Sequence, residues 1–187
     1  EEFAISLAGV YQKENAVLAL NALEELDRLG WTTTMEQRKD GLLHTSWKGR
    51  FTVINKKPLF IVDGAHNAGA ADKMAESVRH YFNGKKLIYI MGVFADKEYK
   101  IVLEKTAHFA EKIYTIETPD NPRALPAEEL AKAARVYNSS AESTKSIKDA
   151  VEKAFSCAGD DENSVILAFG SLSFIGALTN AVEEYVG

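Results

Sequence analysis

Disulfides, clustered histidines and long apolar runs are missing from this sequence. Cys157 is its one cysteine, which excludes a disulfide framework and a cysteine-based metal site. The four histidines have no zinc-site spacing. No segment is apolar over enough residues to cross a membrane and no signal peptide is visible, so we expect a cytoplasmic protein without a membrane partner.

An excess of basic residues is also absent. Lys and Arg number 22 against 27 Asp and Glu, which gives a net charge of -5. Because nucleic acids call for a concentrated basic face, this pattern argues against nucleic acid as a partner. The sequence has no glycine-rich dinucleotide fingerprint and no P-loop, so it predicts neither a dehydrogenase nor a self-sufficient ATPase. A polyphosphate bound here would need help from a metal ion or another domain.

The main pattern in the sequence is an alternation of predicted strands and amphipathic helices. With 187 residues, 46% of them apolar, it suits one domain with a sizeable core. We expect a single domain over residues 1–187, with a helical opening segment in residues 1–50 and the sheet core in residues 51–187. The predicted strands cover residues 52–54, 59–62, 87–91, 112–116 and 165–169. The alternation predicts an α/β, Rossmann-like, mostly parallel twisted sheet with helices on both faces.

Two helices are predicted in the opening segment, and another is predicted between the fourth and fifth strands. Apolar spacing predicts a helix over residues 15–29 and a shorter one that ends near His44. Ser143 is expected to cap a helix whose apolar face includes Ile147 and Phe155.

Polar residues follow the predicted strands where each one ends. After the apolar run 59–62, Asp63-Gly64 stops the strand and an amphipathic helix begins, so Asp63, His66 and Asn67 lie at the carboxyl end of a strand. Right-handed crossovers bring such loops to one edge of the sheet. The residues expected at that edge are Asp63, His66, Asn67, Asp96, Lys97, Arg123 and Ser171.

Each of these residues also has a plain structural explanation. Asp63 or Asn67 could cap helix amides, Asn15 could be an N-cap, and Arg50 and Lys97 could be solvated surface charges. The proline-stiffened loop 118–126 could be a simple connection, or it could hold the Arg123 guanidinium in a fixed pose for a carboxylate. The spacing alone therefore predicts a ligand-binding edge and no named reaction.

Several short motifs occur together in a fixed order along the chain. They are Tyr11-Gln12-Lys13-Glu14-Asn15-Ala16, Trp47-Lys48-Gly49-Arg50-Phe51, Asp63-Gly64-Ala65-His66-Asn67, Gly92-Val93-Phe94-Ala95-Asp96-Lys97 and Gly170-Ser171-Leu172. On these the chain resembles, over essentially its whole length, the C-terminal domain of folylpolyglutamate and dihydrofolate synthases in the Mur ligase superfamily. It departs from the commonest folate-branch pattern at Tyr11, where His is frequent, and at Lys48 and Ala68, where Pro is frequent.

The resemblance implies an ATP-dependent amide ligase. ATP would phosphorylate a carboxylate of the folate, either tetrahydrofolate or dihydropteroate, and the amine of L-glutamate would attack the acyl phosphate with Mg²⁺ offsetting charge. The implied ATP contacts are Asn15 to the base, Asp63 to the ribose and Arg50 to the polyphosphate. The implied catalytic residues are His66, Asn67 and Lys97, and those for glutamate or substrate are His66, Asp96, Arg123 and Ser171.

The same resemblance implies a partner domain. In this family the P-loop and the Mg²⁺ ligands belong to a preceding N-terminal ATPase domain, so no metal ligands are expected in residues 1–187. The sequence opens Glu1-Glu2-Phe3 without methionine, and we expect either processing or a piece of something longer, stable alone but unable to turn over. The loop 120–123 resembles one by which a peptidoglycan Mur ligase grips its diamino acid, which keeps that ligase as an alternative. A non-catalytic α/β binding module is the other.

Overall fold

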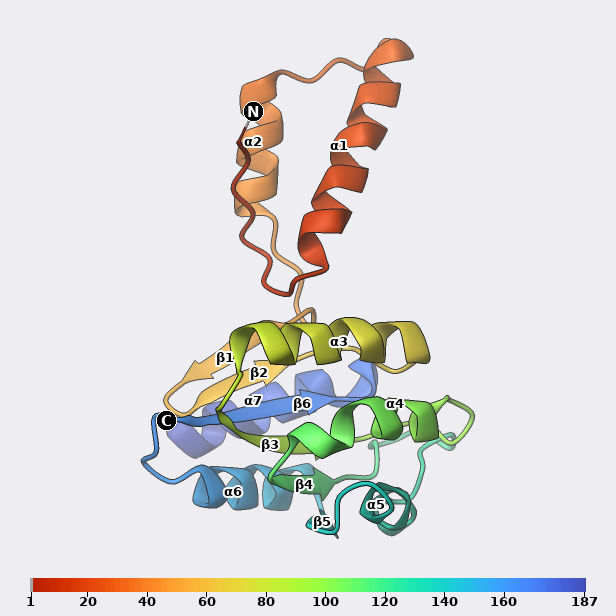
Figure 1. Cartoon of the computed structure of the whole chain (residues 1–187), viewed down its shortest axis with the longest axis vertical. Coiled ribbons are helices and arrows are strands. Elements are labelled where there is room, and N and C mark those ends of the chain that lie inside the picture. Colours follow the sequence, from red (N-terminus) through yellow and green to blue (C-terminus); the bar gives the residue numbers. More distant parts are fainter. Residues whose placement is uncertain (1) are drawn as a thin grey trace.

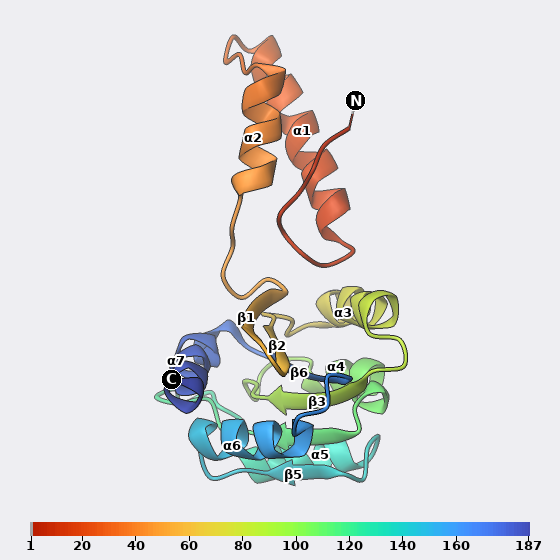
Figure 2. The same cartoon turned by 90° about the vertical axis from the view of Figure 1, so that its left-hand side faces the viewer.

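A helical hairpin and an α/β lobe make up this protein. The computed structural model describes residues 2–187, and the hairpin stands at one end of the lobe (Figures 1 and 2). The α-helices are α1 Gln12–Arg28, α2 Met35–His44, α3 Ala68–Tyr81, α4 Tyr99–Thr106, α5 Ala127–Arg135, α6 Ile147–Ala158 and α7 Ile175–Val186. The strands are β1 Thr52–Lys56, β2 Leu59–Val62, β3 Lys86–Met91, β4 Lys112–Thr115, β5 Ala141–Ser143 and β6 Ser164–Phe169. Short 3₁₀ turns cover Ala107–Phe109 and Leu172–Phe174.

The lobe is built on one six-stranded sheet of order β1-β2-β6-β3-β4-β5. Only β1 runs antiparallel to its neighbour, and the pairs β2–β6, β6–β3, β3–β4 and β4–β5 are parallel. All six residues of the central strand β6 are buried, as a parallel strand covered on both faces requires. The predicted α/β fold class is confirmed.

Helices cover both faces of the sheet (Figure 2). On one face, Met74 of α3, Leu103 of α4 and Leu130 of α5 pack with strand residues such as Tyr89 and Leu167. On the other face, α6 and α7 pack over a second apolar cluster through buried residues that include Val151, Ala154, Leu178 and Val182. Since successive strand side chains point to opposite faces, each of the inner strands β2, β3, β4 and β6 contributes to both clusters.

The hairpin, formed by α1 with the turn 9–11 before it, residues 29–34 and α2, has no such core. Gln12 is the one buried residue of α1, and α2 has none. The helix predicted over residues 15–29 is present, but its apolar stripe is not covered by the lobe. Polar contacts to Asp27 hold the tip of the hairpin together instead. Arg38 forms an ion pair with Asp27, and the backbone N–H of Thr33 donates to Asp27 at 3.0 Å.

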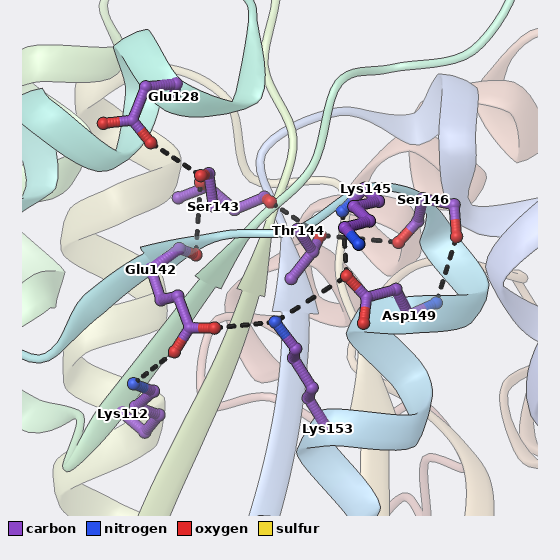
Figure 3. Close-up of polar contacts among 10 residues, drawn as sticks. Lys112, Glu128, Glu142, Ser143, Thr144, Lys145, Ser146, Asp149 and Lys153 are labelled. Atoms are coloured by element: carbon purple, nitrogen blue, oxygen red, sulfur yellow. Dashed lines mark hydrogen bonds and ion pairs between the residues drawn. The ribbon is translucent and has the colours of Figure 1, made fainter.

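The edge strand β5 escaped prediction from the sequence. Ser143 was expected to cap a helix, but it is the last residue of β5, and Ser146 caps α6 by accepting the Asp149 N–H at 3.1 Å. Three residues with one large polar side chain give no apolar alternation to detect. Figure 3 shows Glu142 of this strand between the ammonium groups of Lys112, at 2.8 Å, and Lys153, at 2.6 Å.

No helix among residues 2–187 is both long and apolar enough to cross a membrane.

Candidate functional site

The carboxyl ends of β2, β3 and β6 bring three loops together at one edge of the lobe. Two glycines allow the backbones to meet there. Gly170 has φ +116°, and a Cβ on it would lie 2.5 Å from the carbonyl oxygen of Gly92. A Cβ on Gly64 would lie 2.5 Å from a methyl carbon of Leu172. Glycine is therefore required at these two positions because the loops pass so close to each other that a side chain would not fit.

Asp63 is the buried centre of this edge, with 4% of its surface exposed. Its Oδ1 accepts the N–H of Ala65 at 2.8 Å, and its Oδ2 accepts the N–H of Phe51 at 2.8 Å and the hydroxyl of Tyr11 at 3.1 Å. Burial raises the pKa of Asp63, while these hydrogen bonds and the charge of Arg50 oppose the rise. A carboxylate offers about four lone pairs, so one on Oδ1 remains for a further donor.

Asn15 and Arg50 share a cavity of about 470 Å³ between the hairpin and the linker to the lobe, which we call the hairpin cavity. Tyr11 and Trp47 also line it, and the guanidinium carbon of Arg50 lies 5.6 Å from the centre of the Trp47 ring. The Nδ2 of Asn15 donates to Oε1 of Gln12 at 2.9 Å. Tyr11 and Arg50 line this cavity together, the Tyr11 hydroxyl donates to Asp63, and so does the N–H of Phe51 next to Arg50, so all three residues lie on one side of the molecule.

His66, Lys97 and Ser171 line a second cavity of about 280 Å³, which we call the edge cavity. The Nδ1 of His66 lies 2.7 Å from the carbonyl oxygen of Gly64, so Nδ1 carries the proton, and in the neutral ring Nε2 is an acceptor. The Oγ of Ser171 exchanges a hydrogen bond with Ser173 at 2.7 Å. The sequence thus correctly grouped three residues from three different loops.

The remaining predicted residues have partners within the chain. Asn67 caps α3, because its Oδ1 accepts the N–H of Ala70 at 2.9 Å. Asn67 therefore has the structural role that the sequence offered as its plain explanation. Asp96 and Arg123 form an ion pair in which both side chains are about half exposed. Arg123 lowers the pKa of Asp96 and lies 4.9 Å from the centre of the Phe94 ring.

Tyr11 and Glu98 make contacts near this edge that the sequence did not predict. Tyr11 reaches Asp63 across 52 positions of sequence, and Oε2 of Glu98 accepts the N–H of Ala68 at 3.3 Å beside Asn67. Neither contact leaves a local signal, because each joins segments that are distant in the chain. A hydroxyl at the start of a helix gives no indication of its partner.

The chain is similar in sequence and in fold to several known proteins. A family model described as the Mur ligase glutamate ligase domain matches residues 49–172. The dihydrofolate synthase/folylpolyglutamate synthase of Bacillus subtilis is 28% identical over 184 residues, which are 98% of this chain and 42% of that protein. Folylpolyglutamate synthase from Thermotoga maritima superposes with a TM-score of 0.77 at 26% identity, over 98% of this chain and 41% of that structure.

A structure of lower identity has the same fold. Mycobacterium tuberculosis folylpolyglutamate synthase complexed with ADP and AMPPCP superposes over 100% of this chain and 42% of that one, with a TM-score of 0.83 and 24% identity. The chain therefore spans less than half the length of these relatives. Since the family match covers the carboxyl-edge loops from Gly49 to Leu172, the chain belongs to the family of Mur ligase glutamate ligase domains.

Proposed function

We propose that this chain is the C-terminal part of an ATP-dependent ligase that adds L-glutamate to a folate carboxylate through an acyl phosphate. The observation that carries the proposal is the contact between the residue that precedes Arg50 and the loops that form the edge cavity. The backbone N–H of Gly64 donates to the carbonyl oxygen of Gly49 at 2.8 Å, and a Cβ on either glycine would lie within 2.9 Å of Leu172, which lines the edge cavity. A phosphate donor and its acceptor need adjacent sites of this kind.

The hairpin cavity is the proposed ATP side. Asn15 offers an amide to the base, and Arg50 offers a fixed cation to the polyphosphate, where negative charge accumulates during phosphoryl transfer. Asp63 keeps one lone pair of Oδ1 for a ribose hydroxyl. The ADP and AMPPCP complexes of the M. tuberculosis structure support a nucleotide as the ligand of this fold.

The edge cavity is the proposed side of the reacting carboxylate and of glutamate. Lys97 and Ser171 offer a cation and a hydroxyl to carboxylate oxygens, and Nε2 of His66 can accept a proton from the attacking amine. Asn67 keeps its amide N–H groups beside this loop, while its Oδ1 caps α3. We propose that Arg123, steered by Asp96, holds a carboxylate of glutamate at the rim.

In nucleotide sites Mg²⁺ is held by one or two carboxylates together with the phosphates, not by a dedicated protein cage. No group of three or more His, Cys, Asp or Glu residues within 2–187 could hold a metal ion. We propose, from the family resemblance, that the Mg²⁺ ligands and the P-loop lie in an ATPase domain that this chain contacts.

The hairpin supplies the proposed contact surface for that domain. Leu29 and Trp31 at its tip are 75% and 74% exposed, and Leu18 on α1 is 69% exposed. Apolar side chains gathered on a helical pair without a core indicate an interface. The family match begins at residue 49, which supports treating residues 1–50 as a segment shared with the ATPase domain and 51–187 as the sheet core.

The decisive experiment measures ligation by the longer polypeptide that we propose contains this chain. With ATP, L-glutamate and tetrahydrofolate or dihydropteroate, we expect ADP, phosphate and a folate extended by glutamate. The isolated 187-residue chain should not turn over. Ligation of UDP-linked muropeptides in place of folates, or full activity of the isolated chain, would contradict the proposal.

A further inference from the structure

The hairpin is joined to the lobe by few polar contacts. In the described part of the chain, the N–H of Val10 donates to Oγ of Ser77 at 3.3 Å, Nζ of Lys73 pairs with Glu14 at 2.9 Å, and the hydroxyl of Tyr11 donates to Asp63 at 3.1 Å. The angle between hairpin and lobe therefore depends on a small number of bonds. Asn15 lies on the hairpin side of this junction, and Arg50 lies on the linker that enters the lobe.

One oxygen atom connects both walls of the hairpin cavity. The Oδ2 of Asp63 accepts the N–H of Phe51, the residue after Arg50, and the hydroxyl of Tyr11, which lies one helical turn before Asn15. The N–H of Asn15 donates to the carbonyl oxygen of Tyr11 at 3.2 Å. Thus Asp63 holds the backbone next to Arg50 and, through Tyr11, the first turn of α1.

The Tyr11 ring is held in place by its surroundings. Gly9 has φ +104°, and a Cβ on it would lie 2.9 Å from Cε1 of Tyr11, so the chain passes directly against the ring. The N–H of Gln12 donates to the carbonyl oxygen of Gly9 at 3.0 Å and closes this turn. Burial and the neighbouring Asp63 raise the pKa of Tyr11, so its hydroxyl stays protonated and donates. The Lys73–Glu14 pair, in contrast, is exposed and screened by solvent.

We propose that Tyr11 is a positioning residue, whose hydrogen bond to Asp63 sets α1 so that the amide of Asn15 faces Arg50 across the hairpin cavity. This inference rests on the proposed function, because it assumes that the ligand of the hairpin cavity is a nucleotide. The binding of that nucleotide then depends on the hydrogen bond between Tyr11 and Asp63. Tyr11 does not line the edge cavity, whose lining residues all come from the lobe. Its loss therefore affects the nucleotide and leaves the glutamate site as it was.

The test replaces Tyr11 in the longer polypeptide and measures both Michaelis constants. Tyr11→Phe keeps the ring and removes the hydroxyl, and we expect the KM for ATP to rise about tenfold, the size expected for one hydrogen bond to a charged group, with an unchanged KM for glutamate. Lys73→Ala removes the exposed contact of the same junction and should change the KM for ATP less than twofold.

A second measurement does not depend on activity. In the 187-residue chain, Tyr11→Phe should speed hydrogen exchange of the α1 amides while Lys73→Ala leaves them nearly unchanged, and the thermal unfolding midpoint of the lobe should stay the same. If Tyr11→Phe left the KM for ATP unchanged, or raised the KM values for ATP and glutamate equally, the inference would be overturned. A wild-type polypeptide without ATP-dependent ligation would overturn the proposed function, and the exchange rates would still decide whether Tyr11 holds α1.

Discussion

At the scale of single residues, Asp63 shows how one buried carboxylate organises this edge. Its two oxygens accept three hydrogen bonds from residues in the hairpin, the linker and its own loop. Two of these donors are backbone N–H groups, which require an acceptor because they are buried with it. The residue is therefore needed for the local structure even before any ligand binds.

Asp63→Asn should destabilise the lobe by about 1–3 kcal/mol, because the amide must point one N–H group at a backbone N–H. Urea unfolding of the 187-residue chain, followed by circular dichroism, measures this. Asp96→Asn is the matched control at a half-exposed carboxylate and should change stability by less than about 1 kcal/mol. Equal losses in the two variants would show that burial of Asp63 is not the cause.

Arg123→Ala should raise the KM for glutamate about tenfold and spare the KM for ATP, since a guanidinium is lost only on the glutamate side. Steady-state kinetics of the longer polypeptide measure both constants. Arg79→Ala removes another guanidinium that lies over an aromatic ring, 5.0 Å from the centre of Phe109, and should change neither constant. An unchanged glutamate KM in Arg123→Ala removes this residue from the site.

At the scale of elements, the loops after β3 and β6 meet with no room for a side chain. Gly170→Ala forces a methyl group against the carbonyl of Gly92 in a backbone conformation that favours glycine, and should destabilise the lobe by about 2 kcal/mol or more. Gly69→Ala is the control, because its nearest neighbour is 3.8 Å away in a helix where alanine is preferred. Calorimetric unfolding of both variants checks the difference, and equal midpoints would contradict it.

The edge strand β5 makes stability depend on pH through Glu142. Hydrogen bonds from Lys112 and Lys153 lower the pKa of Glu142 from 4.5 to about 2. Because the folded state holds the charged form, this contribution is present above pH 4.5 and is lost as the pH falls toward 2. Solvent screening limits it to about 1 kcal/mol.

The variant Glu142→Gln should therefore be less stable than the wild type near pH 7, and the difference should shrink as the pH falls from 4.5 toward 2. Urea unfolding at several pH values measures it. A difference that is constant across this range would exclude the charge of Glu142 as its origin.

At the scale of the whole molecule, the two parts of the chain differ in what holds them together. The lobe has two apolar clusters around a buried sheet, while the hairpin has one buried residue in α1 and none in α2. Helices of this length are marginal in water without tertiary packing. The hairpin should therefore open more readily than the lobe.

Hydrogen exchange of the 187-residue chain should show this directly. We expect the amides of α1 and α2 to exchange well before those of β6, which is buried at every position. In the longer polypeptide the hairpin amides should become protected, because the proposed ATPase domain covers Leu29 and Trp31. Unchanged hairpin exchange in that polypeptide would contradict this interface.

The sequence by itself determined the elements of the lobe other than β5, and it determined which polar loops share one edge of the sheet. Runs such as 59–62 and 165–169 carry their own signal, because a strand buried on both faces must be apolar throughout. The right-handed crossover rule then collects His66, Lys97 and Ser171 at one edge, and the structure places them around one cavity.

Only the tertiary structure decided which polar groups meet and which faces stay uncovered. It pairs Tyr11 with Asp63, commits Arg123 to Asp96, adds β5 to the sheet and leaves the hairpin outside the core. The physical reason is that periodicity reports only which face of an element is apolar. The partner of a hydroxyl, or the surface that covers a helix, lies far away in the chain and leaves no local pattern.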